Sequence, residues 1–140
     1  MPPDPKVYAT SFLCERLLRE EDKAMSAIRM VDSWIFGARP DSTDNALAVV
    51  DTTFVTILKC EIEKRFTVTI EGVRPDGVKF GHFESQVSLS GGANGHAIAM
   101  PLLFSVAVFG VHWMEVSVEG EILQRIPLRA SLDTPSAEPI

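Results

Sequence analysis

The stretch from Arg65 to Leu89, RFTVTIEGV-RPDG-VKFGHFESQVSL, decides the fold class of this chain. Its first arm alternates strictly, with Phe66, Val68 and Ile70 on one parity and polar side chains on the other, as in a strand with one buried face. The RPDG segment predicts a turn, because proline presets φ and glycine accepts a positive φ. The stretch therefore predicts a β-hairpin.

The second arm of this hairpin, Val78 to Leu89, is less regular than the first. The apolar residues change from even positions at Phe80 to odd positions at Phe83 and Val87. A change of parity within one strand indicates an inserted residue, so we expect a β-bulge near Gly81.

Strand-like segments continue on both sides of the hairpin. The two that matter most are Met25–Phe36, where Ile28, Met30, Trp34 and Phe36 share one parity, and Ala46–Cys60, which is apolar on both parities. The second predicts a strand covered on both faces, with a helix as the alternative. The other predicted strands are Lys6–Cys14, Ile98–Phe109, Val111–Glu119 and Glu121–Ala130.

The segments between these strands are polar or contain turn residues. Glu15–Lys23 is charged and too short for a stable free helix, so we expect a single helical turn or a loop. Gly37–Asn45 is a predicted loop, and Glu119-Gly120-Glu121 is a predicted hairpin turn. About eight strands without a long amphipathic helix predict an all-β fold, an antiparallel two-sheet β-sandwich (Ig-like or jelly-roll-like) with at most one short helix.

A chain of 140 residues, 46% hydrophobic and 23% charged, fits a single globular domain. We expect residues 1–5 to be a disordered N-terminus, 6–131 a single β-sandwich domain and 132–140 a frayed tail. The parities predict that eight side chains are buried: Ile28, Trp34, Phe54, Phe66, Val68, Ile70, Met114 and Val116.

The charge balance restricts the partners. With 13 basic and 19 acidic residues the net charge is −6, which argues against nucleic acid and anionic membrane, because both need clustered cations. The two cysteines, Cys14 and Cys60, form no CxxC pair, and the start of the chain does not resemble a signal peptide. We therefore expect two buried, reduced thiols and a cytoplasmic location.

The usual signatures of catalysis are missing from the sequence. The three histidines, His82, His96 and His112, are 14 and 16 residues apart and lack a metal-binding spacing. The sequence contains neither a G-x-S-x-G elbow nor a phosphate loop, and its paired carboxylates lie in polar, turn-like stretches. We therefore expect no catalytic residue, cofactor or metal site, although an enzyme with a site assembled from distant residues is a remaining alternative.

Trp113 is the most informative single residue. In Val111–Glu119 the expected core parity is that of Met114, so Trp113 shares the opposite face with Glu115. An outward aromatic side chain beside polar neighbours is either an interaction anchor or is covered by the adjoining loop. His112 falls on the core parity and is expected to be a hydrogen-bonded packing residue.

The Ile98–Phe109 segment carries no Lys, Arg, Asp or Glu and is apolar on both parities. Pro101 lacks the N–H that a central strand needs, which favours a sheet edge or a break. An apolar edge without guarding charges predicts a self-association or partner interface, unless the N-terminal strand or the Gly37–Asn45 loop covers it. The residues expected at such a surface are Trp113, Phe104, Phe109 and Glu115.

Several short motifs resemble a family of short bacterial proteins of unknown function. They are Phe12-Leu13-Cys14-Glu15-Arg16, Met25 to Asp32, Pro101 to Phe104, Gly110-Val111-His112, Val118 to Glu121, and Ile126-Pro127-Leu128-Arg129. Two positions differ, since Arg29 stands where that family usually has Gly and His112 where it tends to have Tyr. The resemblance covers about residues 7 to 130. It implies a β-sandwich, with no known activity and no site residues.

These observations favour a non-enzymatic module for protein–protein interaction or self-association, with a protein partner or a second copy. A small-ligand or carbohydrate-binding sandwich, in which Trp113 is a stacking platform, is the main alternative.

Overall fold

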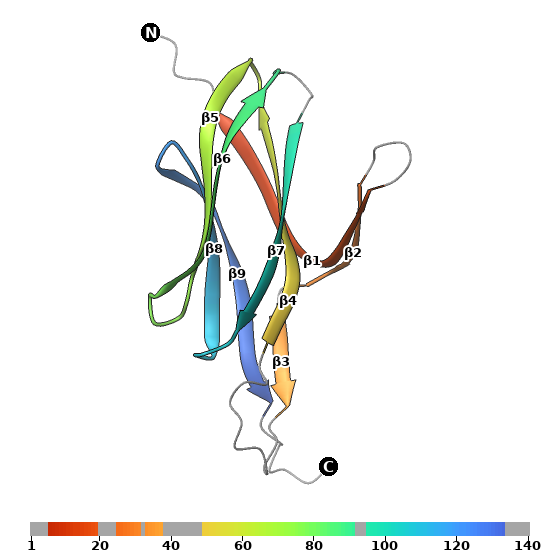
Figure 1. Ribbon diagram of the computed structural model, residues 1–140, viewed down its shortest axis with the longest axis vertical. Coiled ribbons are helices and arrows are strands. Elements are labelled where there is room, and N and C mark those ends of the chain that lie inside the picture. The colour runs from red at the N-terminus through yellow and green to blue at the C-terminus, as the bar shows by residue number, and fades with distance from the viewer. Residues whose placement is uncertain (1–5, 20–24, 32, 38–48, 92–94, 134–140) are drawn as a thin grey trace.

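The computed structural model describes residues 6–19, 25–31, 33–37, 49–91 and 95–133, which form nine strands and no helix (Figure 1). The four-stranded sheet has the order β2-β1-β4-β7, and the five-stranded sheet has the order β3-β9-β8-β5-β6. The predicted all-β sandwich is therefore confirmed. The strands are β1 Val7–Arg19, β2 Met25–Met30, β3 Ser33–Gly37, β4 Val49–Cys60, β5 Lys64–Val73, β6 Lys79–Leu89, β7 Gly95–Ser105, β8 Gly110–Val118 and β9 Glu121–Asp133.

The hairpin that decided the fold class is present as β5 and β6. The backbone N–H of Gly77 donates to the carbonyl of Arg74 at 2.9 Å, and Gly77 has a φ of 85°. The pairing register shifts next to Glu71 and leaves Gly81, with a φ of 61°, as the extra residue. The predicted turn and the predicted bulge are both confirmed.

The second predicted hairpin is formed by β8 and β9. Val118 pairs with Glu121, so the loop has two residues, Glu119 and Gly120, with φ values of 49° and 83°. Two successive residues in the left-handed region are typical of the tight turns whose twist matches that of the strands. The register shifts by one residue between Val116 and Ser117, which the sequence does not indicate.

The prediction of one strand over Met25–Phe36 is wrong, because the chain changes sheets within it. Met30 in β2 pairs with Cys14 in the four-stranded sheet, whereas Trp34 in β3 pairs with Ala130 in the five-stranded sheet. Arg29 has a φ of 57°, outside the extended range, one residue before β2 ends at Met30. The apolar alternation continues through the break, and Met30 is 66% exposed despite its core parity.

The crossing also produces the one parallel pair among the described strands. β3 runs parallel to β9, from Ser33 opposite Arg129 to Gly37 opposite Asp133. The other strand pairs are antiparallel, so the expectation of an antiparallel sandwich holds except at this edge.

The expectation of a helical turn or loop over Glu15–Lys23 is wrong for residues 15–19, and residues 20–23 lie outside the described part of the chain. β1 continues to Arg19 and pairs with β2, with Leu17 opposite Ala27 and Arg19 opposite Met25. This end of the hairpin projects away from the sandwich (Figure 1). The charged residues are tolerated because a projecting hairpin has solvent on both faces.

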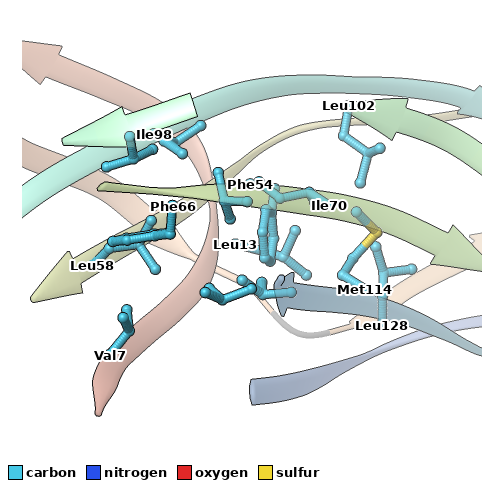
Figure 2. Packing of buried hydrophobic residues seen from close by; sticks show 14 of the residues in the cluster. Val7, Leu13, Phe54, Leu58, Phe66, Ile70, Ile98, Leu102, Met114 and Leu128 are labelled. Carbon is cyan, nitrogen blue, oxygen red and sulfur yellow. The ribbon is translucent and has the colours of Figure 1, made fainter. Parts of the chain in front are cut away.

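The core lies between the two sheets, where side chains from both meet (Figure 2). Six predicted core residues are buried: Phe54, Phe66, Val68, Ile70, Met114 and Val116. Trp34 is only partly buried, and the Ile28 side chain lies outside the described part of the chain. Val55, on the opposite parity of β4, is fully buried, so the middle of this strand is covered on both faces as expected.

Candidate interaction surface

β7 forms one edge of the four-stranded sheet. It pairs with β4 along its whole length, from Gly95 opposite Lys59 to Ser105 opposite Val49, and no described strand pairs with its other side. Pro101 lies within it, and an edge is where a strand tolerates a missing N–H. The predicted edge position is therefore confirmed, although the strand ends at Ser105 rather than at Phe109.

The two faces of β7 differ in character. Ile98 and Leu102 are buried in the core, and Met100 and Phe104 pack partly against it. The opposite parity carries small or apolar residues, namely Ala97, Ala99, Pro101 and Leu103, and Leu103 is 70% exposed. β7 has no Lys, Arg, Asp or Glu that would hinder another strand from approaching.

One of the two edge strands of the other sheet, β6, is charged where β7 is apolar. It carries Lys79, His82 and Glu84, and the bulge at Gly81 disturbs its ladder. Lys79 and His82 contact Glu71 at 3.2 and 2.9 Å, and their hydrogen bonds hold the pKa of this carboxyl below its ordinary value. Charge, a bulge and proline are common ways of protecting an edge, so β6 has two of these devices along its length, whereas β7 has Pro101 alone.

Phe104 points between the sheets rather than outward. Its ring centroid lies 4.6 Å from that of Phe80 and 5.5 Å from that of His112. The even-numbered residues of β7 face the core, so Phe104 follows Leu102 inward. We therefore assign it to packing at the end of the sandwich.

His112 is the buried histidine of this aromatic cluster, as its core parity predicted. It is 1% exposed, and its Nδ1 donates to the carbonyl of Gly110 at 3.3 Å. Burial lowers the pKa of His112 below its ordinary value, because the charged imidazolium would lose its hydration.

Trp113 lies on the outer face of the five-stranded sheet, between Val73 and Pro127 in the register. The Arg125 guanidinium lies 4.5 Å from the centre of its ring, and Arg125 also pairs with Glu115 at 3.1 Å. Trp113 is thus partly covered by a neighbouring side chain. Sequence reasoning did not identify Arg125, because its position depends on the register shift in β9.

The structure brings together two of the four residues expected at the interaction surface. Trp113 and Glu115 share the outer face of the five-stranded sheet, where Arg125 connects them. Phe104 belongs to the interior, and Phe109 is 41% exposed in the connection between β7 and β8. These four residues therefore do not form one continuous surface.

Cys14 and Cys60 are both free and buried. Cys60 pairs with Val7 and Cys14 with Thr53, so the two thiols are about 23 Å apart along adjacent strands, too far for a disulfide. Burial raises the pKa of the Cys14 thiol.

Within the described ranges, no group of three or more His, Cys, Asp or Glu side chains could hold a metal ion. The same residues contain no helix that is long and apolar enough to span a membrane.

No protein-family model and no curated protein matches the chain. The solved structures that match the chain include those of a β-glucosidase from Listeria innocua. Its complexes with isofagomine and with glucose are both 10% identical to this chain, with a TM-score of 0.48. Each match covers 91% of this chain but only 16% of the β-glucosidase.

Proposed function

We propose that this chain is a non-enzymatic protein-interaction module that binds another polypeptide at the open edge of β7. The observation that carries the proposal is the contrast between β6 and β7, two of the four described edge strands. β6 is protected by charged residues and a bulge, whereas β7 exposes small and apolar side chains and has only Pro101 as an interruption.

An edge strand is a template for another strand, because one side of its backbone lacks ladder partners. A partner strand added to β7 would gain main-chain hydrogen bonds, and the exposed side chains would select which strand binds. Leu103 is the largest exposed apolar side chain of β7 and would be the anchor. Association would remove its apolar surface from water, which stabilises the complex.

The carbohydrate alternative is less well supported by the geometry. Sugar rings stack on an open aromatic face, but the Arg125 guanidinium already lies over the ring of Trp113. A sugar would have to displace this guanidinium and disrupt its ion pair with Glu115. The β7 edge is the better supported site.

Site-specific photocrosslinking in the native cells tests the proposal. A benzophenone amino acid is introduced at Leu103 on β7, or at Ser88, which is exposed on the protected strand β6. We expect a protein adduct from position 103 and little or none from position 88.

A third variant combines the crosslinker at position 103 with Ala99→Lys, which adds a guarding charge to the same strand. This change should remove most of the adduct while circular dichroism remains that of the folded protein. Equal adducts from positions 103 and 88, or an adduct that is insensitive to Ala99→Lys, would contradict the proposed docking site.

A further inference from the structure

The outward side chains of β7 fit those of β7 in a second copy of the chain when the two strands run antiparallel. From Gly95 to Leu103 they change from small to bulky, and Ser105 ends the strand; the residues are Gly95, Ala97, Ala99, Pro101 and Leu103. When two copies run antiparallel with Ala99 facing Ala99, each Leu103 faces a Gly95 and each Pro101 faces an Ala97. A shift of two residues places Leu103 opposite Ala97 instead of Gly95, so the largest outward side chain no longer faces the residue that has none.

The charges of the neighbouring strand support the same register. Asp51 pairs with Leu103 and Lys59 with Gly95, so β4 carries an acid at one end of the edge and a base at the other. The antiparallel arrangement puts Lys59 of one copy in the same row as Asp51 of the other. The dimer therefore contains two such rows, each with one Lys59 and one Asp51, because the two-fold axis repeats the contact.

The Lys59 side chain already lies across β7 toward the open edge. A Cβ added at Gly95 would come within 3.1 Å of Lys59 Cγ and 3.2 Å of its Cε. About two strand spacings, roughly 10 Å, then separate this ammonium group from the Asp51 backbone of a second copy. The aliphatic stem of Lys59 would pack under the incoming Leu103, as long basic side chains commonly do.

Pairing through β7 stops at two copies of the chain. Each copy uses its β7, and the far edge of the same sheet is β2, a six-residue strand in which Arg29 has a φ of 57°. A short, irregular and charged strand is a poor template for further addition. Two-fold pairing therefore gives a dimer with one continuous sheet rather than a fibre.

We infer that the partner at the β7 edge is a second copy of this chain, bound antiparallel with Ala99 on the two-fold axis. The inference rests on the proposed function, since it names the occupant of that docking site.

Disulfide trapping tests the register. Ala99→Cys places two thiols opposite each other across the axis, so mild oxidation should yield a covalent dimer. Ala97→Cys is the matched control, because its two thiols would be about 13 Å apart in this register, beyond the reach of a disulfide. Cys14 and Cys60 are buried and should not interfere while the protein is folded.

Sedimentation of charge-reversal variants gives an independent readout. At low salt, Asp51→Lys or Lys59→Asp should each raise the dimer dissociation constant roughly three- to tenfold, because attraction becomes repulsion in both rows. The double variant should restore most of the affinity.

A monomer at every concentration, or equal trapping at positions 97 and 99, overturns the second copy as the occupant. If the photocrosslinker at Leu103 then yields an adduct with a mass other than twice that of the chain, the docking site stands with a foreign protein as its partner. If Leu103 yields no specific adduct either, the proposed function falls as well.

Discussion

Protonation of His112 should destabilise this fold in a defined pH window. The ring is 1% exposed and packs against both Phe80 and Phe104, with centroid distances of 5.7 and 5.5 Å. Two charged groups of the β5–β6 turn act on it: Arg74 opposes an imidazolium, whereas Asp76 favours it. Burial is the largest cause and lowers the pKa of His112 in the folded state.

The sign of the effect follows from proton linkage. In the unfolded chain a histidine has a pKa of about 6.5, so below this pH the unfolded state binds a proton that the folded state resists. The free energy of unfolding therefore carries no penalty from His112 above about pH 6.5, and it falls as the pH drops from there toward the lowered pKa of the folded state. The slope approaches about 1.4 kcal/mol per pH unit for one proton, and it vanishes once both states are protonated.

Urea unfolding at pH 7.5, 6.5 and 5.5, followed by tryptophan fluorescence, measures this slope for the wild type and for His112→Phe. The variant keeps an aromatic ring but cannot titrate, so its free energy of unfolding should vary less over the window. The pKa values of Glu71 and Asp76 are lowered, so these carboxyl groups do not titrate between pH 5.5 and 7.5. His96→Gln, which replaces a histidine at an exposed position, is the matched control. Parallel curves for the wild type and His112→Phe would refute the reasoning.

Three further predictions concern stability and thiol chemistry. Phe54→Ala removes a fully buried ring and should lower the free energy of unfolding by about 3–5 kcal/mol in urea titrations; a loss below about 1 kcal/mol would mean that its face is wrongly assigned. Arg29→Gly should raise the melting temperature, because glycine relieves a φ of 57° and only an exposed ion pair with Glu15 is lost; a lower melting temperature would contradict this. Without reductant, Cys14 and Cys60 should resist alkylation in the folded protein and both react after urea unfolding, as counted by mass spectrometry; two unreactive thiols after unfolding would indicate a disulfide.

Local signals predicted the features that depend on local chemistry. The turn at Gly77 and the bulge at Gly81 follow from turn residues and from a parity switch that only an inserted residue explains. The edge position of β7 follows from Pro101, because proline has no N–H to donate and is therefore excluded from most positions in the central strands of a sheet. Each of these signals lies within a few residues of the feature it predicts.

The features that were missed depend on distant parts of the chain. The change of sheet between Met30 and Trp34 leaves the alternation intact, so periodicity cannot detect it. The site around Trp113 depends on one inserted residue in β9: with the register of the turn alone, Gln124 would face Glu115, but the shift brings Arg125 there. A sequence can therefore indicate that a side chain points outward without indicating which neighbour meets it.

The same limit applies to the residues that the sequence places at an interaction surface. The absence of charge in Ile98–Phe109 indicated an interface, but the segment divides in the structure into an inward row that ends at Phe104 and an outward row that ends at Leu103. Both rows are apolar, so charge cannot distinguish the row that packs the core from the row that faces solvent. The distinction comes from β4, whose Asp51 and Lys59 lie on the outward side of the pairing and mark its two ends. The proposed interface on β7 therefore rests on the charges of the strand beside it as well as on its own composition.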